Sequence, residues 1–207
     1  RQIVFHGADG VGKGLCAAVG QVVARHTGDD DVPQAEPPGG LRNAGRLVAE
    51  AGAQAVKLEG GADKFGAAIA AILHAGIPVM GHIGLTPQSV NQLGGFKVQG
   101  RDAAAREQLK ESARGLEEAG CFSIVLECIP SDLAREITAA LSIPTIGIGA
   151  GEGCDGQVLV FHDLLGWGRT RFAKTYADVR ATQIDAFAQY AKEVKSGAFP
   201  QGEHAYK

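Results

Sequence analysis

The segment Ala119-Gly-Cys-Phe-Ser-Ile-Val-Leu-Glu127 shows the pattern that decides the fold. It joins the end of an Ala-rich, helix-spaced stretch to a glycine, a continuous apolar run and an acidic residue. Glycine suits the left-handed residue that ends many helices. A continuous apolar run is typical of a strand that is buried on both faces, as in parallel sheets covered by helices. The segment therefore predicts a helix, a stop, a buried strand and a polar group at the strand's carboxyl end.

The same order recurs along the chain. Ala51-Gly52 and Ala75-Gly76 also place glycine after a helix-spaced stretch, and an apolar run follows each within a few residues. Repeated helices and buried strands of this kind predict a parallel βα fold. We expect helices at 41–51, 65–75, 103–119, 133–141 and 176–194, and strands at 3–5, 55–58, 77–80, 123–126, 144–148 and 158–161. The Pro- and Gly-rich stretch 27–40 is expected to be an exposed loop.

Side chains capable of chemistry follow these strands. Lys57 and Glu59 come at the end of one strand, His82 after the next, and Glu127 after a third. The carboxyl ends of strands form the active site both in a (β/α)8 barrel and in a doubly wound sheet. The barrel is favoured because polar groups follow so many successive strands. Since only six strands are recognisable, we predict a (β/α)8 barrel, either complete or incomplete at its N-terminus, within a single domain over residues 1–207.

The composition excludes several classes of protein. The chain has 207 residues, 45% hydrophobic, so it has enough apolar surface to fold. Its net charge of −3 gives no basic excess, and we expect neither a nucleic-acid nor a membrane partner. The four cysteines include no CxxC pair, which favours reduced thiols in the cytosol. Without a signal-peptide pattern or an apolar run long enough to span a membrane, the expected location is cytoplasmic.

Three acidic and basic side chains and one histidine are the candidate site. Lys57 and Glu59 are two residues apart on a strand, so both side chains leave the same face. A buried carboxylate is costly unless it is paired or binds a metal, and an ion pair is the alternative for Glu59. Glu127 is a candidate general base, or else a carboxylate that is hydrogen-bonded to a neighbouring loop. His82 is equally consistent with a core histidine and with a ligand-binding group.

A second motif points to a different function. The stretch Gly7-Ala-Asp-Gly-Val-Gly-Lys-Gly14 has the spacing of a phosphate-binding loop. Gly14, however, stands where such loops carry the Ser or Thr that holds magnesium. A nucleotide-binding protein is therefore kept as a weaker alternative.

From Leu41 onward the chain resembles the 3-methyl-2-oxobutanoate hydroxymethyltransferase (ketopantoate hydroxymethyltransferase) family. The resemblance implies a barrel of the phosphoenolpyruvate/pyruvate type. It further implies transfer of a hydroxymethyl group from 5,10-methylenetetrahydrofolate to 3-methyl-2-oxobutanoate, with Mg²⁺ as cofactor, in large homo-oligomers, typically decamers. The matching motifs are Val56-Lys-Leu-Glu-Gly-Gly61, Gly81-His-Ile-Gly-Leu-Thr-Pro-Gln-Ser-Val90, Gly94-Gly-Phe-Lys-Val-Gln-Gly-Arg101, Leu126-Glu-Cys-Ile-Pro130, Ile143-Pro-Thr-Ile-Gly-Ile-Gly-Ala-Gly151, Asp155-Gly-Gln-Val-Leu-Val160, Phe172-Ala-Lys-Thr-Tyr-Ala-Asp178 and Glu203-His204.

By this resemblance, each candidate residue receives a role. Glu127 is the proton acceptor and Lys57 contacts the keto acid, and we assign His82 to substrate binding beside it. Glu59 belongs to the magnesium site. The first forty residues depart from the family pattern, but Asp9 and Asp31 loosely match its two other metal-binding aspartates and are assigned as further magnesium ligands. Because of that departure, a catalytically impaired remnant that serves as an assembly subunit is the second alternative.

Overall fold

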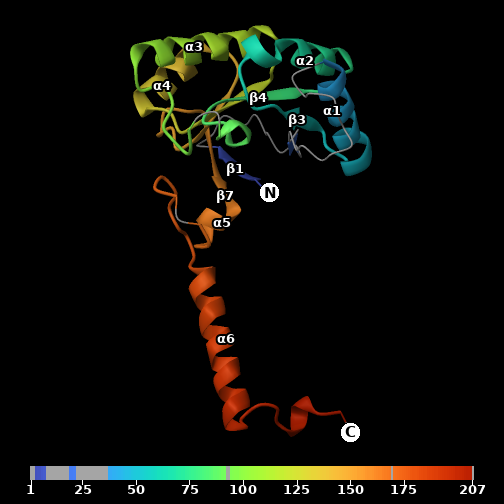
Figure 1. Ribbon diagram of the computed structural model, residues 1–207, viewed down its shortest axis with the longest axis vertical. Coiled ribbons are helices and arrows are strands. Elements are labelled where there is room, and N and C mark those ends of the chain that lie inside the picture. Colours follow the sequence, from blue (N-terminus) through green and yellow to red (C-terminus); the bar gives the residue numbers. More distant parts are fainter. Residues whose placement is uncertain (1–2, 8–18, 22–36, 92–93, 169, 207) are drawn as a thin grey trace. The chain divides into compact units, whose positions relative to one another are not determined.

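The computed structural model describes residues 3–7, 19–21, 37–91, 94–168 and 170–206 (Figure 1). The chain divides into two compact units. One is Phe5–Val158, and the other combines Arg1–Val4 with Leu159–Lys207. The single domain expected from the sequence stays a prediction. All four candidate site residues described below belong to the larger unit.

The strands form one sheet whose order follows the chain. The sheet order is β1-β7-β6-β5-β4-β3-β2, and each neighbouring pair from β2 to β7 is parallel. From β2 to β7, each strand therefore lies beside the strand that precedes it in the sequence, as in a βα barrel. The strands are β1 (Ile3–Gly7), β2 (Val19–Gln21), β3 (Ala55–Lys57), β4 (Val79–Gly84), β5 (Ser123–Glu127), β6 (Thr145–Ile148) and β7 (Gly156–Val160).

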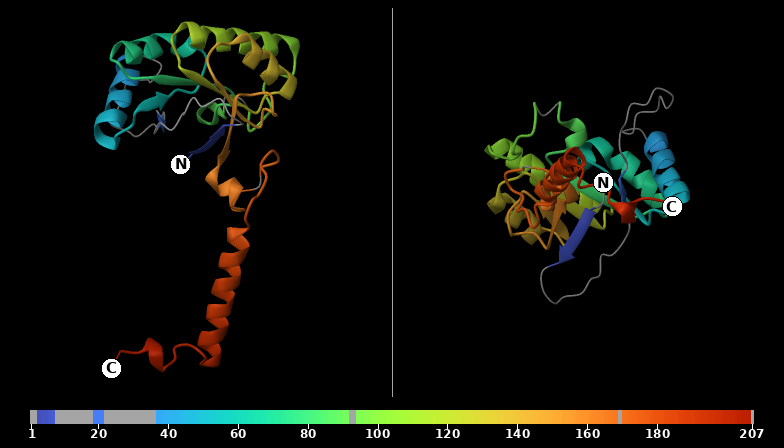
Figure 2. Two further views of the ribbon diagram at one scale, coloured as in Figure 1. Left: turned by 180° about the vertical axis from the view of Figure 1, so that it is seen from behind. Right: turned by 90° about the horizontal axis from the view of Figure 1, so that it is seen from below.

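Four helices cover one face of the sheet. These are α1 (Pro37–Ala51), α2 (Ala62–His74), α3 (Ala103–Glu118) and α4 (Ser131–Ala140). Consecutive helices contact one another, and Figures 1 and 2 show all four on the same side of the strands. A doubly wound sheet would carry helices on both faces. The predicted barrel-type fold is confirmed, with seven strands in the described part of the chain.

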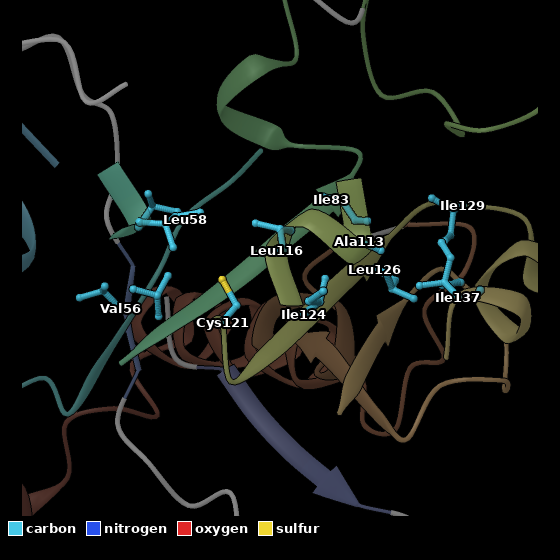
Figure 3. Packing of buried hydrophobic residues seen from close by; sticks show 14 of the residues in the cluster. Val56, Leu58, Ile83, Ala113, Leu116, Cys121, Ile124, Leu126, Ile129 and Ile137 are labelled. Carbon is cyan, nitrogen blue, oxygen red and sulfur yellow. The ribbon is translucent and has the colours of Figure 1, made fainter. Parts of the chain in front are cut away.

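The core lies between the helices and the sheet. Val56 of β3, Leu58 directly after β3, and Ile124 and Leu126 of β5 belong to the same buried cluster as Leu116 of α3 (Figure 3). The residues between them in each strand point to the opposite face, because side chains alternate along a strand. That opposite face is also largely buried, and it carries Lys57, Met80, His82, Val125 and Glu127. Burial of both faces explains the continuous apolar runs in the sequence.

The predicted helix stops are confirmed. Gly52, Gly76 and Gly120 have φ values of 67°, 80° and 96°, in the region that glycine adopts most easily. A further stop, Gly197 with φ 72°, ends α6 (Val179–Ser196), which begins after an N-cap at Asp178. The remaining elements are α5 (Phe161–Leu164) and two single-turn helices, η1 (Pro87–Ser89) and η2 (Gly202–His204). No helix in the described part is long and apolar enough to cross a membrane.

Two sequence expectations need correction. The stretch 27–40 is expected to be an exposed loop, but α1 already begins at Pro37, and Gly39 and Gly40 are buried. Proline is tolerated there because the N–H groups of a first helical turn have no partner within the helix. Residues 27–36 lie outside the described residues. In addition, the sequence does not predict β2, since Val19-Gly-Gln21 contains no apolar run.

Glu117, near the end of α3, fastens that helix to the segment before β6. Its Oε1 accepts hydrogen bonds from the Ser142 hydroxyl at 2.6 Å, the Ser142 N–H at 2.7 Å and the Ile143 N–H at 3.3 Å. These bonds, those from Ser142 above all, lower the pKa of the Glu117 carboxyl below its ordinary value. Since bonds to a carboxylate are stronger than bonds to a neutral acid, the ionised form stabilises the fold.

We expect Glu117→Gln to lower the free energy of unfolding at pH 7, because a neutral amide accepts these hydrogen bonds less strongly than a carboxylate. The loss should be no more than about 1 kcal/mol, because the site is partly exposed to solvent. A lowered carboxyl pKa gives stability that is present above the pKa of the unfolded chain and is lost as the pH falls through the folded pKa. The difference from the parent should therefore shrink in acid. Urea unfolding at pH 7 and about pH 3.5 measures it. Glu118→Gln, at the exposed neighbouring position, is the control, and equal effects of the two variants would contradict the assignment.

Candidate active site

His82 joins the two candidate carboxylates. It lies in β4 with 1% of its surface exposed. Its Nε2 lies 3.1 Å from Oε2 of Glu127, at the end of the neighbouring strand β5, and 3.1 Å from the carbonyl oxygen of Leu85. Its Nδ1 faces Oε1 of Glu59, which follows β3, at 4.0 Å. Three adjacent strands thus bring an imidazole and two acids together at one edge of the sheet.

Glu59 is held at its side chain and at the backbone that follows it. The N–H of Gln88, in η1, donates to Oε2 of Glu59 at 3.0 Å. The N–H of Gly60 donates to the carbonyl oxygen of His82 at 2.8 Å, in an isolated bridge between the segment after β3 and β4. The Glu59 side chain is 1% exposed. A carboxylate so deeply buried needs such donors, because burial without them is costly.

The end of β5 is fixed as firmly. The carbonyl oxygen of Glu127 accepts the N–H of Leu85 at 2.8 Å. Gly84, paired with Glu127 in the sheet, has φ 92°, and a Cβ there would overlap that carbonyl oxygen. The next residue after Glu127, Cys128, has φ 49°, the only positive φ among the described non-glycine residues. Left-handed backbone at a residue other than glycine costs free energy and is often found at functional sites.

Cys128 itself is a poor nucleophile. Burial, together with the negative charge of Glu127, raises the pKa of the Cys128 thiol to about 11. The thiol is therefore protonated at neutral pH, and a protonated thiol does not attack.

Lys57 places a cation on the same face. It lies in β3, in register with Met80 of β4, and is 8% exposed. It stands two residues before Glu59, so the alternation along the strand directs both side chains to the same side of the sheet. The predicted grouping of Lys57, Glu59, His82 and Glu127 at one edge therefore agrees with their positions. Asp9 and Asp31 lie outside the described residues.

Some features of the site are not foreseen by the sequence. His82 is expected after its strand, but β4 runs on to Gly84, so the imidazole is held inside the sheet. The hydrogen bond from Gln88 is missed because the donor is its backbone N–H. Every residue except proline has this group, so the residue type does not reveal the donor. Thr86-Pro87 before it does signal a turn, and that turn presents the N–H. The role of Gly84 needs the strand register, which the sequence does not show.

The donor set is compatible with magnesium. Among the described residues, no three His, Cys, Asp or Glu side chains gather into a metal site. Magnesium nevertheless takes only one or two protein carboxylates, and completes its octahedron with water and substrate oxygens. The buried carboxylate of Glu59 supplies one such ligand. The Nδ1 of His82, which has no hydrogen-bond partner among the described residues, faces this carboxylate at 4.0 Å.

Comparison with known proteins identifies the family. A model of ketopantoate hydroxymethyltransferase matches residues 31–202, which include all four described site residues. The chain belongs to the ketopantoate hydroxymethyltransferase family. The family match begins ten residues before Leu41, where the resemblance read from the sequence starts, so the likeness is not confined to 41–207.

Curated members of the family are closely similar. The 3-methyl-2-oxobutanoate hydroxymethyltransferase of Moorella thermoacetica is 56% identical over 84% of this chain and 65% of that relative. That of Clostridium novyi is 58% identical over 80% of this chain and 61% of the relative. That of Anaeromyxobacter dehalogenans is 51% identical, and the match covers 99% of this chain and 67% of the relative. The chain thus spans 61% to 67% of the length of these three relatives.

Among solved structures, the N-acetylneuraminate lyase of Mycoplasma synoviae matches 63% of this chain and 45% of that chain. Its TM-score is 0.43 and its sequence identity 12%. A likeness at this level carries no argument about function.

Proposed function

We propose that this chain transfers a hydroxymethyl group from 5,10-methylenetetrahydrofolate to 3-methyl-2-oxobutanoate. The product is 2-dehydropantoate, a precursor of pantothenate and coenzyme A. Membership of the ketopantoate hydroxymethyltransferase family supports the reaction. The observation that carries it is the contact of His82 with Glu127 at 3.1 Å, beside buried Glu59, at the carboxyl edge of a parallel sheet. That edge is where βα barrels perform chemistry.

The reaction needs a base, and Glu127 fits. Its carboxylate accepts the proton from C3 of the keto acid, and the electron pair of that C–H bond forms the enolate. The enolate carbon then bonds to the one-carbon unit of the folate. Both bonds that join the one-carbon unit to the two folate nitrogens break, and water supplies the hydroxyl group. The proton from C3 and the second proton of water end on those nitrogens, and tetrahydrofolate leaves. A well-placed base accelerates such a proton transfer by about 10²–10⁴-fold.

The other residues bind and orient. Lys57 presents an ammonium group on the same face as Glu59, which suits the carboxylate of the keto acid. His82 lies between the two acids, and we assign it to substrate binding. Glu59 would hold Mg²⁺, with Asp9 and Asp31 as further ligands. Bound Mg²⁺ would act as a Lewis acid that stabilises negative charge on the keto oxygen.

The proposal also covers the co-substrate, the cellular location and the oligomeric state. The folate is a co-substrate, the location is the cytoplasm, and the chain assembles into homo-oligomers, as decamers. Family membership supports all three, and native mass spectrometry of the purified chain tests the last. No observation on the described residues favours the nucleotide-binding alternative, whose motif lies outside them from residue 8 to residue 14. The alternative of a catalytically impaired remnant differs from the proposal because a remnant would lack a full set of metal ligands. A metal-binding measurement therefore separates the two.

The direct test is product formation. The purified chain is incubated with Mg²⁺, 3-methyl-2-oxobutanoate and 5,10-methylenetetrahydrofolate, and 2-dehydropantoate is followed by mass spectrometry. The parent chain should form product, whereas omission of either substrate should abolish it. Absence of product together with normal folding would favour the remnant.

We expect the affinity for Mg²⁺ to depend on the keto acid. Glu59 alone is a weak site, and the nearby ammonium of Lys57 opposes a dication, whereas the two oxygens of a keto acid complete a chelate. Titration calorimetry with Mg²⁺, with and without 3-methyl-2-oxobutanoate, measures the difference. Tight binding of Mg²⁺ without the keto acid, unchanged in the double variant Asp9→Asn and Asp31→Asn, would show that these ligands are wrongly assigned.

A further inference from the structure

We propose that the 94–99 segment, Gly-Gly-Phe-Lys-Val-Gln, binds the folate co-substrate, with Phe96 against an aromatic ring of the folate and Lys97 against a carboxylate of its glutamate. The inference rests on the proposed function, because it supplies a site for the second substrate of that reaction. The segment belongs to one of the motifs that carry the family resemblance, and the site described above gives it no role.

The start of the segment is tied to the turn that holds Glu59. The segment lies in the connection from β4 to α3, which leaves the sheet at the carboxyl edge. The N–H of Gly95 donates to the carbonyl oxygen of Val90, the residue directly after η1, at 2.9 Å. Within η1, the N–H of Gln88 donates to the carboxylate of Glu59 at 3.0 Å. The segment therefore begins beside the turn that contacts one of the two site acids.

The end of the segment is tied to the other acid. The N–H of Gln99 donates to the carbonyl oxygen of Cys128 at 2.9 Å. Cys128 is the residue directly after Glu127, the proposed base. The two ends of the segment are thus held next to the two site carboxylates, and a ligand bound by the segment lies near the reacting atoms.

The backbone around Phe96 is held in one conformation. Gly94 and Gly95 have φ values of 69° and 105°, which few other residues adopt. The N–H of Lys97 donates to the carbonyl oxygen of Gly95 at 3.0 Å, so Phe96 is the middle residue of a three-residue turn. Nε2 of Gln99 donates to the carbonyl oxygen of Lys97 at 2.9 Å. A ring presented by a fixed backbone loses little conformational entropy when it binds a ligand.

The side chains that this turn presents are free to bind. Phe96 is 80% exposed, and Val98 beside it is 38% exposed. Lys97 is also exposed, and no acidic side chain among the described residues forms an ion pair with it. A single exposed apolar residue needs no explanation. An exposed aromatic ring next to an exposed cation, on a turn tied to the site, is a more specific combination.

The chemistry of the folate matches this combination. Its one-carbon unit joins a nitrogen of the pterin ring to the nitrogen of the aminobenzoyl ring, and the glutamate follows that second ring. The one-carbon unit has to reach C3 of the keto acid, from which Glu127 removes the proton. The ring and the glutamate then extend away from the base. Phe96 suits the ring, since aromatic rings stack on one another, and the ammonium of Lys97 suits a carboxylate.

Phe96→Ala should raise the KM for 5,10-methylenetetrahydrofolate about tenfold, because the stacking partner is lost. Phe96→Tyr keeps an aromatic ring and should stay within about twofold of the parent. Exchange of the C3 proton of the keto acid without folate does not use this surface, and Phe96→Ala should exchange like the parent. Tyr206→Ala, which removes a fully exposed ring in the smaller unit, is the control and should leave the KM for folate unchanged.

Lys97→Gln should raise the KM for the folate about two- to fivefold at low salt, the effect of losing an exposed ion pair. Lys97→Arg keeps the charge and should lose less. At about 0.5 M salt the difference between Lys97→Gln and the parent should nearly disappear, because exposed charges are screened.

Three results would overturn the inference. The first is an unchanged KM for the folate in Phe96→Ala. The second is a fall in C3 exchange and in stability to urea that matches the change in KM, which would indicate a structural role. The third is dissociation of an oligomer of Phe96→Ala in native mass spectrometry with an unchanged KM for the folate, which would make the segment a contact between copies of the chain.

A binding measurement keeps this inference separate from the proposed function. Titration calorimetry of the parent chain with tetrahydrofolate, in the presence of the keto acid, should show binding that weakens about tenfold in Phe96→Ala. If the parent binds tetrahydrofolate in this way but forms no product, the proposed function fails and the inference stands. If the parent forms product and Phe96→Ala binds tetrahydrofolate equally well, only the inference fails. A parent chain that does not bind tetrahydrofolate overturns both.

Discussion

Glu127→Gln should slow exchange of the C3 proton of 3-methyl-2-oxobutanoate by about 10²–10⁴-fold, because a glutamine cannot accept the proton. Binding of the keto acid should be nearly unchanged. Glutamine has nearly the shape of glutamate, so its amide can take the same place beside His82, whose Nε2 lies 3.1 Å from the present carboxylate oxygen. The substitution therefore removes the base and leaves its surroundings in place.

Exchange in deuterated water without folate, followed by proton NMR, isolates this step. Calorimetry with the keto acid measures binding separately. Glu118→Gln, which removes a carboxylate from the exposed end of α3, serves as the control and should exchange like the parent. If Glu127→Gln exchanged at the rate of the parent, another group would be the base.

Gly84→Ala should destabilise the fold by about 3–5 kcal/mol, which is a large part of the stability of an ordinary domain. Gly84 has φ 92°, and an added Cβ would overlap the carbonyl oxygen of Glu127 and lie 2.8 Å from Cγ2 of Ile129. That carbonyl is backbone and cannot move aside without breaking the pairing of β4 and β5. The variant should also slow proton exchange, because the shift displaces Glu127.

Gly95→Ala is the matched control. Gly95 has φ 105°, similar to that of Gly84, but no atom of the described residues lies within 4 Å of its Cβ position. It should lose only the cost of left-handed backbone, about 1–2 kcal/mol. Urea unfolding of the two variants and the parent gives the comparison. Losses of the same size would show that the contact with Glu127 is not what requires glycine at position 84.

Much of the fold is readable from local patterns. Continuous apolar runs predict every described strand except β2, since burial on both faces removes the polar alternation of an exposed sheet. Glycine after each helix predicts the left-handed stops at Gly52, Gly76 and Gly120, a purely local property of the backbone. Polar residues after strands predict which edge of the sheet carries the site.

What is missed depends on contacts between distant segments. β2 has three residues, and its parallel pairing with β3, not its composition, makes it a strand. α1 begins at Pro37 within a stretch whose Pro and Gly content is typical of loops, and its buried face offsets that preference. A short stretch of sequence does not show burial of this kind, because the burial comes from contacts with distant segments.

The candidate site shows the same division. Glu127 and Glu59 are conspicuous in the sequence because burying a carboxylate beside an apolar strand costs free energy unless it is paired or binds a ligand. The central place of His82 is not readable, because it requires the registers of β4 and β5 together, and only these place Nε2 near both Leu85 and Glu127. The hydrogen-bond donor at Gln88 is its backbone N–H, and the residue type at a position does not reveal such a donor.

The chain-ordered sheet has a consequence for how the protein is made. From β2 to β7, each strand pairs with the one that left the ribosome just before it. Synthesis proceeds at about 5–20 residues per second, far slower than a helix forms or a short loop closes. Each new βα unit can therefore pair with a strand that is already folded. The unpaired edges of the growing sheet are those of β2 and of the newest strand, and β1 joins the sheet once β7 is made. Growth in this order keeps aggregation-prone edges few at every stage of translation.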